Sequence, residues 1–195
     1  MARIEEGNRM LDIRKALPGD EDGLWAILEP VIRAGDTYDF PRQTNREDAL
    51  RAWLAPDNVC YVAQDGGELV GTYVLHPNRK GAGAHVANCG YMTAGHAHGR
   101  GIGSAMCAHS LEEARSAGYR AMQFNFVLAS NRRAVELWQR MGFEVVGRVP
   151  EAFLHPVDGY TDALVMYRRL TPPASSPPLP TPDPENPTPV RARHT

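Results

Sequence analysis

Apolar residues change their spacing repeatedly between Leu11 and Leu170, which predicts a succession of short elements. Alternating or continuous apolar runs predict strands at 11–16, 59–64, 68–75, 85–93, 121–128, 143–149 and 162–168. Apolar residues three and four positions apart predict helices at 20–34, 44–54, 102–117 and 131–141. Three consecutive strands before the third helix indicate an α+β fold with a mixed, mainly antiparallel, seven-stranded sheet.

Two local signals mark where the first helices begin. Asp20 follows a Pro-Gly break and is a residue type that often precedes a helix. Thr44 has Glu47 three residues later, which is the spacing of a capping box. We therefore expect the first helix to start at Asp20 and the second to be capped by Thr44.

Composition changes once along the chain, near Leu170. Segment 171–195 holds nine of the 16 prolines and almost no apolar residues, so it cannot bury enough surface to offset the entropy of ordering. We predict one folded domain at 11–170, a flexible N-terminus at 1–10 and a disordered proline-rich tail at 171–195. The tail prolines could dock a proline-binding domain, although a solvated tail needs no partner.

Charge and cysteine content exclude several classes of function. A formal net charge of −2 over 195 residues gives no global reason to expect nucleic acid or a membrane as partner. No apolar run approaches the roughly 20 residues that span a bilayer, and the N-terminus does not resemble a signal peptide. Three cysteines without C-x-x-C spacing argue against a disulfide framework or a zinc site. We expect reduced thiols and a cytoplasmic location.

The clearest chemical signal is a glycine-rich turn between a predicted strand and a long helix. Its sequence is His98-Gly99-Arg100-Gly101-Ile102-Gly103-Ser104. Alternate glycines leave one side of the turn without Cβ atoms, and the first amides of the helix have no intrahelical acceptor. Such a turn can bind phosphate with main-chain N–H groups. The spacing fits neither the Walker nor the dinucleotide pattern, and a plain tight turn that caps a helix is the alternative.

A second motif follows in the predicted helix at 131–141. It reads N-R-R-A-V-E-L-W-Q-R-M-G-F from Asn131 to Phe143. Together the two motifs resemble the GNAT superfamily of N-acetyltransferases, whose members carry Q/R-x-x-G-x-G/A and then N-x-x-A-x-x-L-Y-x-x-x-G-F. The resemblance implies acetyl-CoA as cosubstrate without a metal, helices on both faces of the sheet, and a cleft where the fourth and fifth strands, 85–93 and 121–128, splay apart.

The resemblance also implies roles for individual residues. Amides near Met92 and Thr93 would bind the pantetheine arm, Asn131 would reach it from the opposite helix, and the small Ala134 would leave room beside the thioester. The pyrophosphate would lie on Gly99, Arg100, Gly101, Ile102, Gly103 and Ser104.

Two positions in these motifs depart from the family pattern. His98 stands where relatives usually have Arg or Gln, and it can still donate to phosphate. His96 beside it could suggest a metal pair, but no third ligand is apparent. Trp138 stands where many relatives have the tyrosine that protonates the departing thiolate. An indole N–H cannot serve as that acid, although a thiolate leaves reasonably well without help.

Two asparagines mark the predicted acceptor side of the cleft. Asn88 and Asn125 interrupt apolar strands that should face each other, so their amides either bond to each other or are offered to a ligand. From Gly71 onward the chain resembles the azetidine-2-carboxylate (proline-analogue) acetyltransferases of yeasts and fungi, which also have Trp at the position of Trp138. That resemblance implies that Asn88 and Asn125 line the acceptor pocket and hold the amine and carboxylate. Tyr38, on an aromatic loop, is expected at its rim.

These patterns predict direct transfer of an acetyl group to the amine of a small molecule within a ternary complex. A proline analogue or another amino acid is the acceptor that the resemblance favours. No glutamate stands on either cleft strand, so the sequence does not identify the base. A non-catalytic acyl-CoA-binding module and a protein or peptide acetyltransferase stay open as alternatives. A homodimer is expected only as a family tendency.

Overall fold

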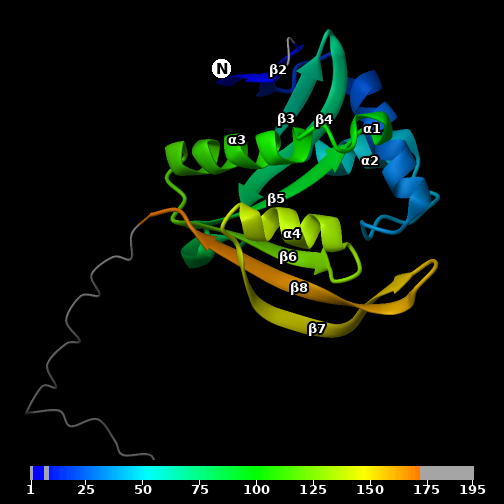
Figure 1. Cartoon of the computed structure of the whole chain (residues 1–195), viewed down its shortest axis with the longest axis vertical. Coiled ribbons are helices and arrows are strands. Elements are labelled where there is room, and N and C mark those ends of the chain that lie inside the picture. Colours follow the sequence, from blue (N-terminus) through cyan, green and yellow to red (C-terminus); the bar gives the residue numbers. More distant parts are fainter. Residues whose placement is uncertain (1, 7–8, 172–195) are drawn as a thin grey trace, which may run out of the picture.

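One mixed sheet organises the protein in the computed structural model, which describes residues 2–6 and 9–171 (Figure 1). Its strand order is β1-β2-β3-β4-β5-β6-β8-β7. The strands are β1 (Ala2–Glu6), β2 (Arg9–Lys15), β3 (Val59–Asp65), β4 (Glu68–Pro77), β5 (Val86–Thr93), β6 (Ala121–Leu128), β7 (Glu144–His155) and β8 (Gly159–Arg169). Neighbouring strands run antiparallel, except that β5 and β6 are parallel. The predicted mixed, mainly antiparallel α+β sheet is confirmed.

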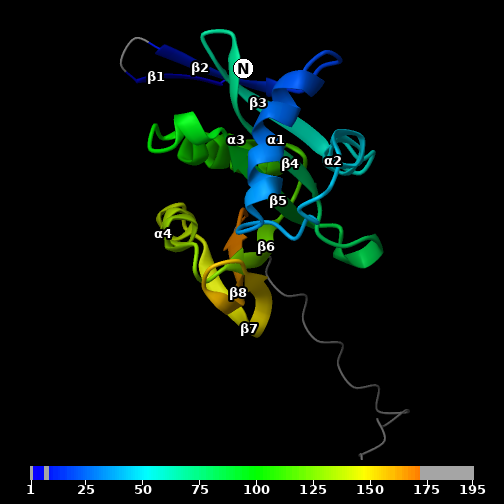
Figure 2. The same cartoon turned by 90° about the vertical axis from the view of Figure 1, so that its right-hand side faces the viewer.

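Helices cover both faces of this sheet, as predicted (Figure 2). They are α1 (Glu21–Ala34), α2 (Arg46–Trp53), α3 (Ile102–Ser116) and α4 (Arg132–Arg140), with short 3-10 turns η1 (Gly81–Gly83) and η2 (Gly95–Ala97). On one face the indole N–H of Trp53 in α2 donates to Thr72 of β4 at 3.0 Å. On the other face Ser110 of α3 bonds Tyr91 of β5 at 2.7 Å. The buried core therefore has two layers, one on each side of the sheet.

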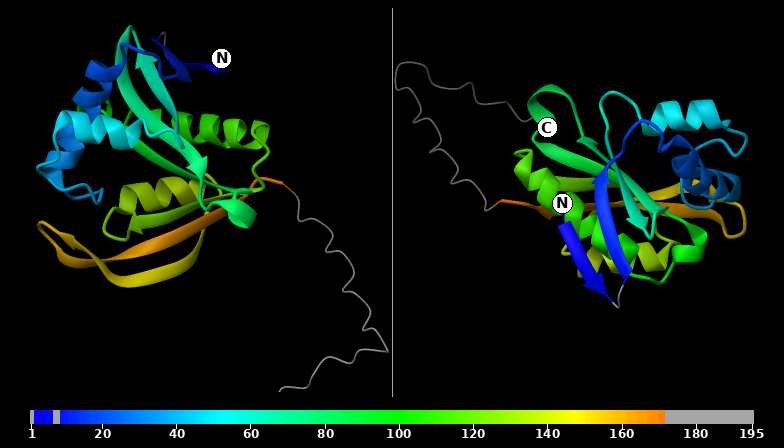
Figure 3. Two further views of the ribbon diagram at one scale, coloured as in Figure 1. Left: turned by 180° about the vertical axis from the view of Figure 1, so that it is seen from behind. Right: turned by 90° about the horizontal axis from the view of Figure 1, so that it is seen from above.

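The N-terminal edge of the sheet differs from the expectation of a flexible segment at 1–10. There β1 pairs antiparallel with β2 over five positions, from Ala2 opposite Ile13 to Glu6 opposite Arg9, which makes eight strands in place of seven. This hairpin lies at one end of the sheet and the β7–β8 hairpin at the other (Figure 3). Charges of both signs conceal the alternation of this segment in the sequence. The predicted tail, apart from Thr171, lies outside the described residues.

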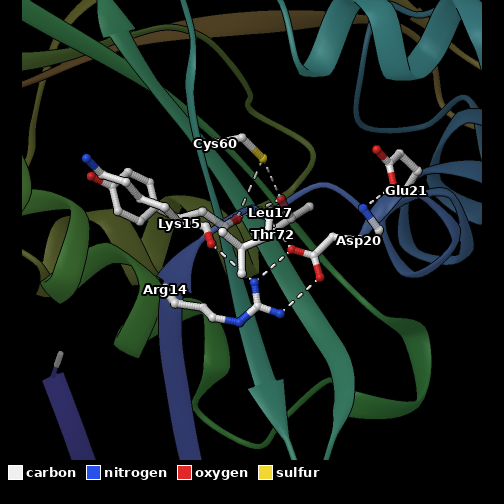
Figure 4. A network of polar contacts seen from close by, with 9 residues as sticks. Arg14, Lys15, Leu17, Asp20, Glu21, Cys60 and Thr72 are labelled. Carbon is white, nitrogen blue, oxygen red and sulfur yellow. Dashed lines mark hydrogen bonds and ion pairs between the residues drawn. The ribbon is translucent and has the colours of Figure 1, made fainter.

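A partly buried ion pair ties the end of β2 to the start of α1 (Figure 4). Arg14 donates from both terminal nitrogens to the Asp20 carboxylate at 2.7 and 2.9 Å, and the Leu17 N–H donates to it at 2.7 Å. Asp20 stands at the N-cap position of α1, as expected, but its side chain makes no capping bond. The hydrogen bond from Arg14 holds the pKa of the Asp20 carboxyl below its usual value.

The predicted cap of α2 is wrong by one residue. Asn45 is the N-cap, and its side chain accepts from the Asp48 N–H at 2.9 Å. Thr44 instead donates its hydroxyl to the Pro41 carbonyl at 2.6 Å, which closes the preceding loop. The two residues are both good caps, and the loop geometry selects between them.

The parallel pair of strands separates soon after it forms. Only Val86 opposite Ala121 and Ala87 opposite Met122 are paired between β5 and β6. Beyond them β6 continues to Leu128 against β8, with an irregularity between Phe124 and Val127. The splay that was predicted between these two strands is confirmed, and it leaves one edge of β5 without a neighbouring strand.

Candidate functional site: a cavity in the parted sheet

The register of β5 determines which backbone groups face the gap. The Asn78 N–H donates to the Val86 carbonyl at 2.7 Å, and the Ala94 N–H donates to the Val70 carbonyl at 3.0 Å. In an antiparallel pair every second residue exchanges such bonds, so the even-numbered residues of β5 point their backbone groups at β4. Tyr91 and Thr93 therefore point theirs at the gap.

This alternation of backbone directions distinguishes between the two residues, Met92 and Thr93, whose amides were predicted to bind the pantetheine arm. Met92 stands opposite Thr72 and turns its backbone to β4, while its side chain is buried. Thr93 has the orientation that the prediction needs. Tyr91, which the sequence analysis did not single out, has it as well, and only the register of β5 against β4 reveals this.

Tyr38 reaches the open edge of β5 from the loop between α1 and α2. Its hydroxyl donates to the Tyr91 carbonyl at 2.8 Å. Burial raises the pKa of the Tyr38 phenol, which keeps the proton on this donor. Gly90 makes room for the contact, since a Cβ there would lie 3.2 Å from the Tyr38 hydroxyl oxygen. The N–H of Tyr91 is left facing the gap.

A cavity of about 370 Å³ occupies this gap. Its walls come from the α1–α2 loop, from Trp53 at the end of α2, from β4, β5 and β6, and from α4. Around it the structure brings together six of the residues predicted from the sequence, Tyr38, Asn88, Asn125, Asn131, Ala134 and Trp138. The cavity thus connects the face of the sheet that carries α1 and α2 with the face that carries α4.

Aromatic rings form much of the cavity wall. On the α4 side Trp138 packs against Tyr91 and Phe124, with ring centroids 4.9 and 5.0 Å apart. On the opposite side Tyr38 meets Trp53 edge to face at 6.1 Å. Polar side chains also line the cavity, so a bound ligand would meet apolar walls together with several groups that can orient it, namely Thr37, Asp39, His76, Asn88, Asn125 and Asn131.

The two predicted asparagines have different surroundings. The Asn125 amide donates to the side-chain oxygen of Asn78 at 2.6 Å and accepts from Gln123 at 2.8 Å. The side chain of Asn88 has no hydrogen bond to any part of the chain that the structure describes. The two amides therefore do not bond to each other, and Asn125 is held in place by partners that the sequence analysis missed.

His76 also lines the cavity, and sequence reasoning missed it. It stands directly opposite Asn88 in the β4–β5 register, so the two side chains share one face of the sheet. Its Nδ1 lies 3.0 Å from the Pro77 carbonyl oxygen. A histidine near the end of an otherwise apolar strand was the signal available in the sequence.

The glycine-rich turn forms the N-terminus of α3, outside this cavity. Gly99 and Gly101 have φ angles of 80° and 78°, a left-handed conformation that favours glycine. The first bond within the helix runs from the Ala105 N–H to the Gly101 carbonyl. Ile102, Gly103 and Ser104 consequently have amides without an acceptor inside the helix. These features fit a diphosphate, because the amides and the helix dipole both attract negative charge.

Side chains around the turn fix its position. The Arg100 guanidinium pairs with Asp65 at the end of β3, and His96 lies 3.3 Å from Glu68. His98 is exposed. A Cβ on Gly103 would approach Leu137 of α4 to 3.2 Å, so glycine lets α3 and α4 pack closely here. Within the described ranges, no group of three metal-ligating side chains gathers at this turn or elsewhere.

The three cysteines are free and buried. Cys89 lines the cavity, and burial raises the pKa of its thiol well above the ordinary value. Burial likewise raises the pKa of Cys107 to about 12. A nucleophilic cysteine needs a thiolate, so Cys89 is poorly suited to carry an acyl group.

No helix in the described part of the chain is long and apolar enough to cross a membrane.

Comparisons with known proteins agree with this geometry. The family model described as "Acetyltransferase (GNAT) family" matches residues 25–143. The N-acetyltransferase aca1 of Schizosaccharomyces pombe is 31% identical over 98 residues, which are 50% of this chain and 47% of that protein. The chain thus matches about half the length of this relative.

Two solved structures share the fold. A GCN5-related N-acetyltransferase from Kribbella flavida is 41% identical, with a TM-score of 0.77 over 82% of this chain and 97% of that chain. A GNAT superfamily phosphinothricin acetyltransferase (Pat) from Sinorhizobium meliloti, in complex with AcCoA, has a TM-score of 0.74 at 18% identity. That match covers 87% of this chain and 94% of the other, and at this identity it shows the fold alone.

Proposed function

Because the chain belongs to the GNAT acetyltransferase family, we propose that it transfers the acetyl group of acetyl-CoA to the amine of a small molecule. The observation that carries this proposal is the unpaired edge of β5 beside a cavity of about 370 Å³. An extended pantetheine arm can pair with such an edge, and the cavity has room for a compact acceptor next to it.

The cosubstrate would be held from three sides. The amides of Ile102, Gly103 and Ser104 would bind the pyrophosphate, with His98, Gly99, Arg100 and Gly101 completing the predicted turn. The backbone of Tyr91 and Thr93, beside Met92, would bind the pantetheine arm. Asn131, Ala134 and Trp138 would flank the thioester from α4. The thioester supplies an activated acyl group, and the Tyr91 N–H that faces the gap would stabilise negative charge on its oxygen.

The acceptor would lie between the α1–α2 loop and β6. We propose Tyr38, Asn88 and Asn125 as its contacts, with a proline analogue or another amino acid as the first acceptors to test. The partial similarity to the Schizosaccharomyces pombe N-acetyltransferase supports an amine acceptor. The absence of Lys or Arg from the described lining leaves amides and His76 to orient any carboxylate.

We further propose that the amine attacks directly within a ternary complex. A covalent acyl-cysteine route would need a thiolate, and burial keeps Cys89 protonated. Binding both reactants in one cavity would supply much of the acceleration by holding them in contact.

A non-catalytic acyl-CoA-binding module is the second candidate function. Trp138 favours it, because its indole cannot donate a proton to a departing thiolate. Thiol release from acetyl-CoA, measured against a panel of secondary and primary amines, separates the two. Accelerated release with a mass gain of one acetyl group on an amine supports the transferase. Binding of CoA in calorimetry without release by any amine would support the module. Acetylation only of added peptides would support a protein or peptide acetyltransferase.

We also propose a homodimer formed through the β7–β8 hairpin. Large apolar side chains are exposed along it, including Val146, Leu154 and Tyr160. Exposed apolar surface of this kind commonly marks a protein contact. Light scattering coupled to size exclusion should give twice the mass of one chain, and Leu154→Glu should reduce the measured mass to that of a single chain.

We propose a cytoplasmic location, which the three buried free thiols support.

A further inference from the structure

We propose that His76 is the general base that removes the proton of the acceptor amine. This proposal rests on the transferase function proposed above. It fills a role for which no residue was apparent in the sequence, since neither cleft strand carries a glutamate.

The position of His76 places its ring on the acceptor side of the gap. It lines the same cavity as Tyr38 and Asn125, and it stands beside Asn88 on one face of the sheet. The side chain is half-buried, so it can exchange a proton with solvent after each turnover. A general base must reach the proton that it abstracts, and the shared cavity provides that access.

One hydrogen bond determines which ring nitrogen can act. Nδ1 lies 3.0 Å from the Pro77 carbonyl oxygen, and a carbonyl can only accept. Nδ1 therefore carries a hydrogen in the neutral ring, and the lone pair is on Nε2. The carbonyl thus selects the tautomer that leaves Nε2 available as the base.

The other titratable groups of the cavity are poorer candidates. Tyr38 donates its hydroxyl hydrogen to the Tyr91 carbonyl, and burial raises the pKa of Tyr38, Cys89 and Tyr91, so each retains its proton. Asp39 is an exposed residue of the α1–α2 loop and lines the same cavity. Among the described lining residues, Asp39 is the rival to His76, and it is included in the test.

The step balances without another reactant. The amine nitrogen forms a bond to the acetyl carbonyl carbon, and its proton passes to Nε2 of His76. The carbon–sulfur bond breaks, and the electron pair leaves with the sulfur as a thiolate, which takes a proton from solvent. His76 returns its proton to water. The products are the acetylated amine and free CoA thiol.

The test compares His76→Gln with a matched control, His85→Gln. His85 has the same local contact, with Nδ1 3.1 Å from the Ala82 carbonyl, but does not line the cavity. We expect His76→Gln to lower kcat by about 10²- to 10⁴-fold. We expect His85→Gln to stay within about twofold of the wild type, and calorimetric affinity for acetyl-CoA to be unchanged in both.

A pH profile separates a base from a merely structural residue. The wild-type rate should rise with pH as one group of the free enzyme loses its proton, and this rising part of the profile should be missing in His76→Gln. The rising part should stay at the same pH for two acceptor amines of different basicity. Added imidazole should partly restore His76→Ala, whose fold is checked by thermal unfolding.

The outcomes distinguish this proposal from the one on which it rests. A wild type that binds acetyl-CoA but acetylates no amine overturns the transferase function, and the base assignment with it. An active wild type matched by His76→Gln overturns the base assignment alone. A pH profile whose rising part shifts with the basicity of the acceptor amine overturns the base assignment as well. So does a loss of kcat that is seen in Asp39→Asn and absent from His76→Gln.

Discussion

The hydroxyl of Tyr38 donates to the backbone carbonyl of Tyr91 at 2.8 Å, across 53 positions of sequence. This bond joins the α1–α2 loop to the open edge of β5. It satisfies the carbonyl of Tyr91 and leaves the N–H of the same residue facing the gap. Tyr38 therefore decides which polar groups the strand offers to a ligand.

Tyr38→Phe should lower kcat/KM for the acceptor more than it lowers the affinity for acetyl-CoA. The ring and its packing are kept, while the Tyr91 carbonyl loses its partner. A lost hydrogen bond of this kind costs about 1 kcal/mol, so kcat/KM for the acceptor should fall roughly 3- to 10-fold. Steady-state kinetics and calorimetry with acetyl-CoA check this. Tyr61→Phe, whose hydroxyl bonds Glu113 on the other face, is the control. An equal effect in both variants would contradict the assignment.

Gly101→Glu should abolish binding of acetyl-CoA. The left-handed φ of 78° disfavours any side chain, and the added carboxylate would repel the diphosphate at the helix N-terminus. Affinity measured by calorimetry should fall by at least about 100-fold, because like charges in contact cost several kcal/mol.

Gly159→Glu is the matched control for that substitution. Gly159 has a φ of 73° and open space around it, at the start of β8. Gly159→Glu should have the same backbone strain as Gly101→Glu but should keep the wild-type affinity for acetyl-CoA. Micromolar binding by Gly101→Glu would show that the turn does not hold the phosphates.

Asn125→Ala should raise the acceptor KM or lower kcat and leave the affinity for CoA nearly unchanged. Removal of this amide also deprives Asn78 and Gln123 of a partner. The cost of about 1–3 kcal/mol corresponds to roughly a 5- to 150-fold loss in kcat/KM. Asn78→Ala should reproduce part of it by freeing Asn125. An equal loss of CoA affinity would instead move Asn125 to the cosubstrate side.

Asp20→Asn should destabilise the fold in a manner that depends on pH. Since the folded-state pKa of Asp20 lies below its usual value of 3.8, the stabilisation is complete above that usual value and is lost as the pH falls through the folded pKa. At pH 7 the free energy of unfolding in urea should drop by about 1.5–3 kcal/mol. The difference should shrink in acid. Asp22→Asn, at an exposed pair with Arg46, should cost less than about 1 kcal/mol.

Local patterns were sufficient for the features that depend on neighbouring residues. The glycines at 99, 101 and 103 define the glycine-rich turn, and the run from Asn131 to Phe143 defines the helix that faces it. The separation of the fourth and fifth predicted strands could be predicted because the two motifs together resemble the GNAT superfamily, in which these strands splay apart. The pairing of β5 with β6 at only two positions confirms it.

Features set by distant contacts were not predictable in the same way. The direction of the Tyr91 backbone follows from the register of β5 against β4, which no local pattern specifies. The partner of Asn125 is Asn78, 47 positions away. His76 belongs to the cavity only because β4 ends beside Asn88. The choice of Asn45 over Thr44 as helix cap depended on the Pro41 loop.

Unpaired strand edges normally invite other chains to add strands, and proteins protect them with charges, bulges or covering elements. Here the free edge of β5 lies in the interior of the sheet, between β6 on one side and the α1–α2 loop above it. The α1–α2 loop and α4 line the cavity beside this edge, and these covering elements limit the access of another chain. The fold therefore keeps a reactive backbone edge permanently available without exposing the protein to aggregation through it.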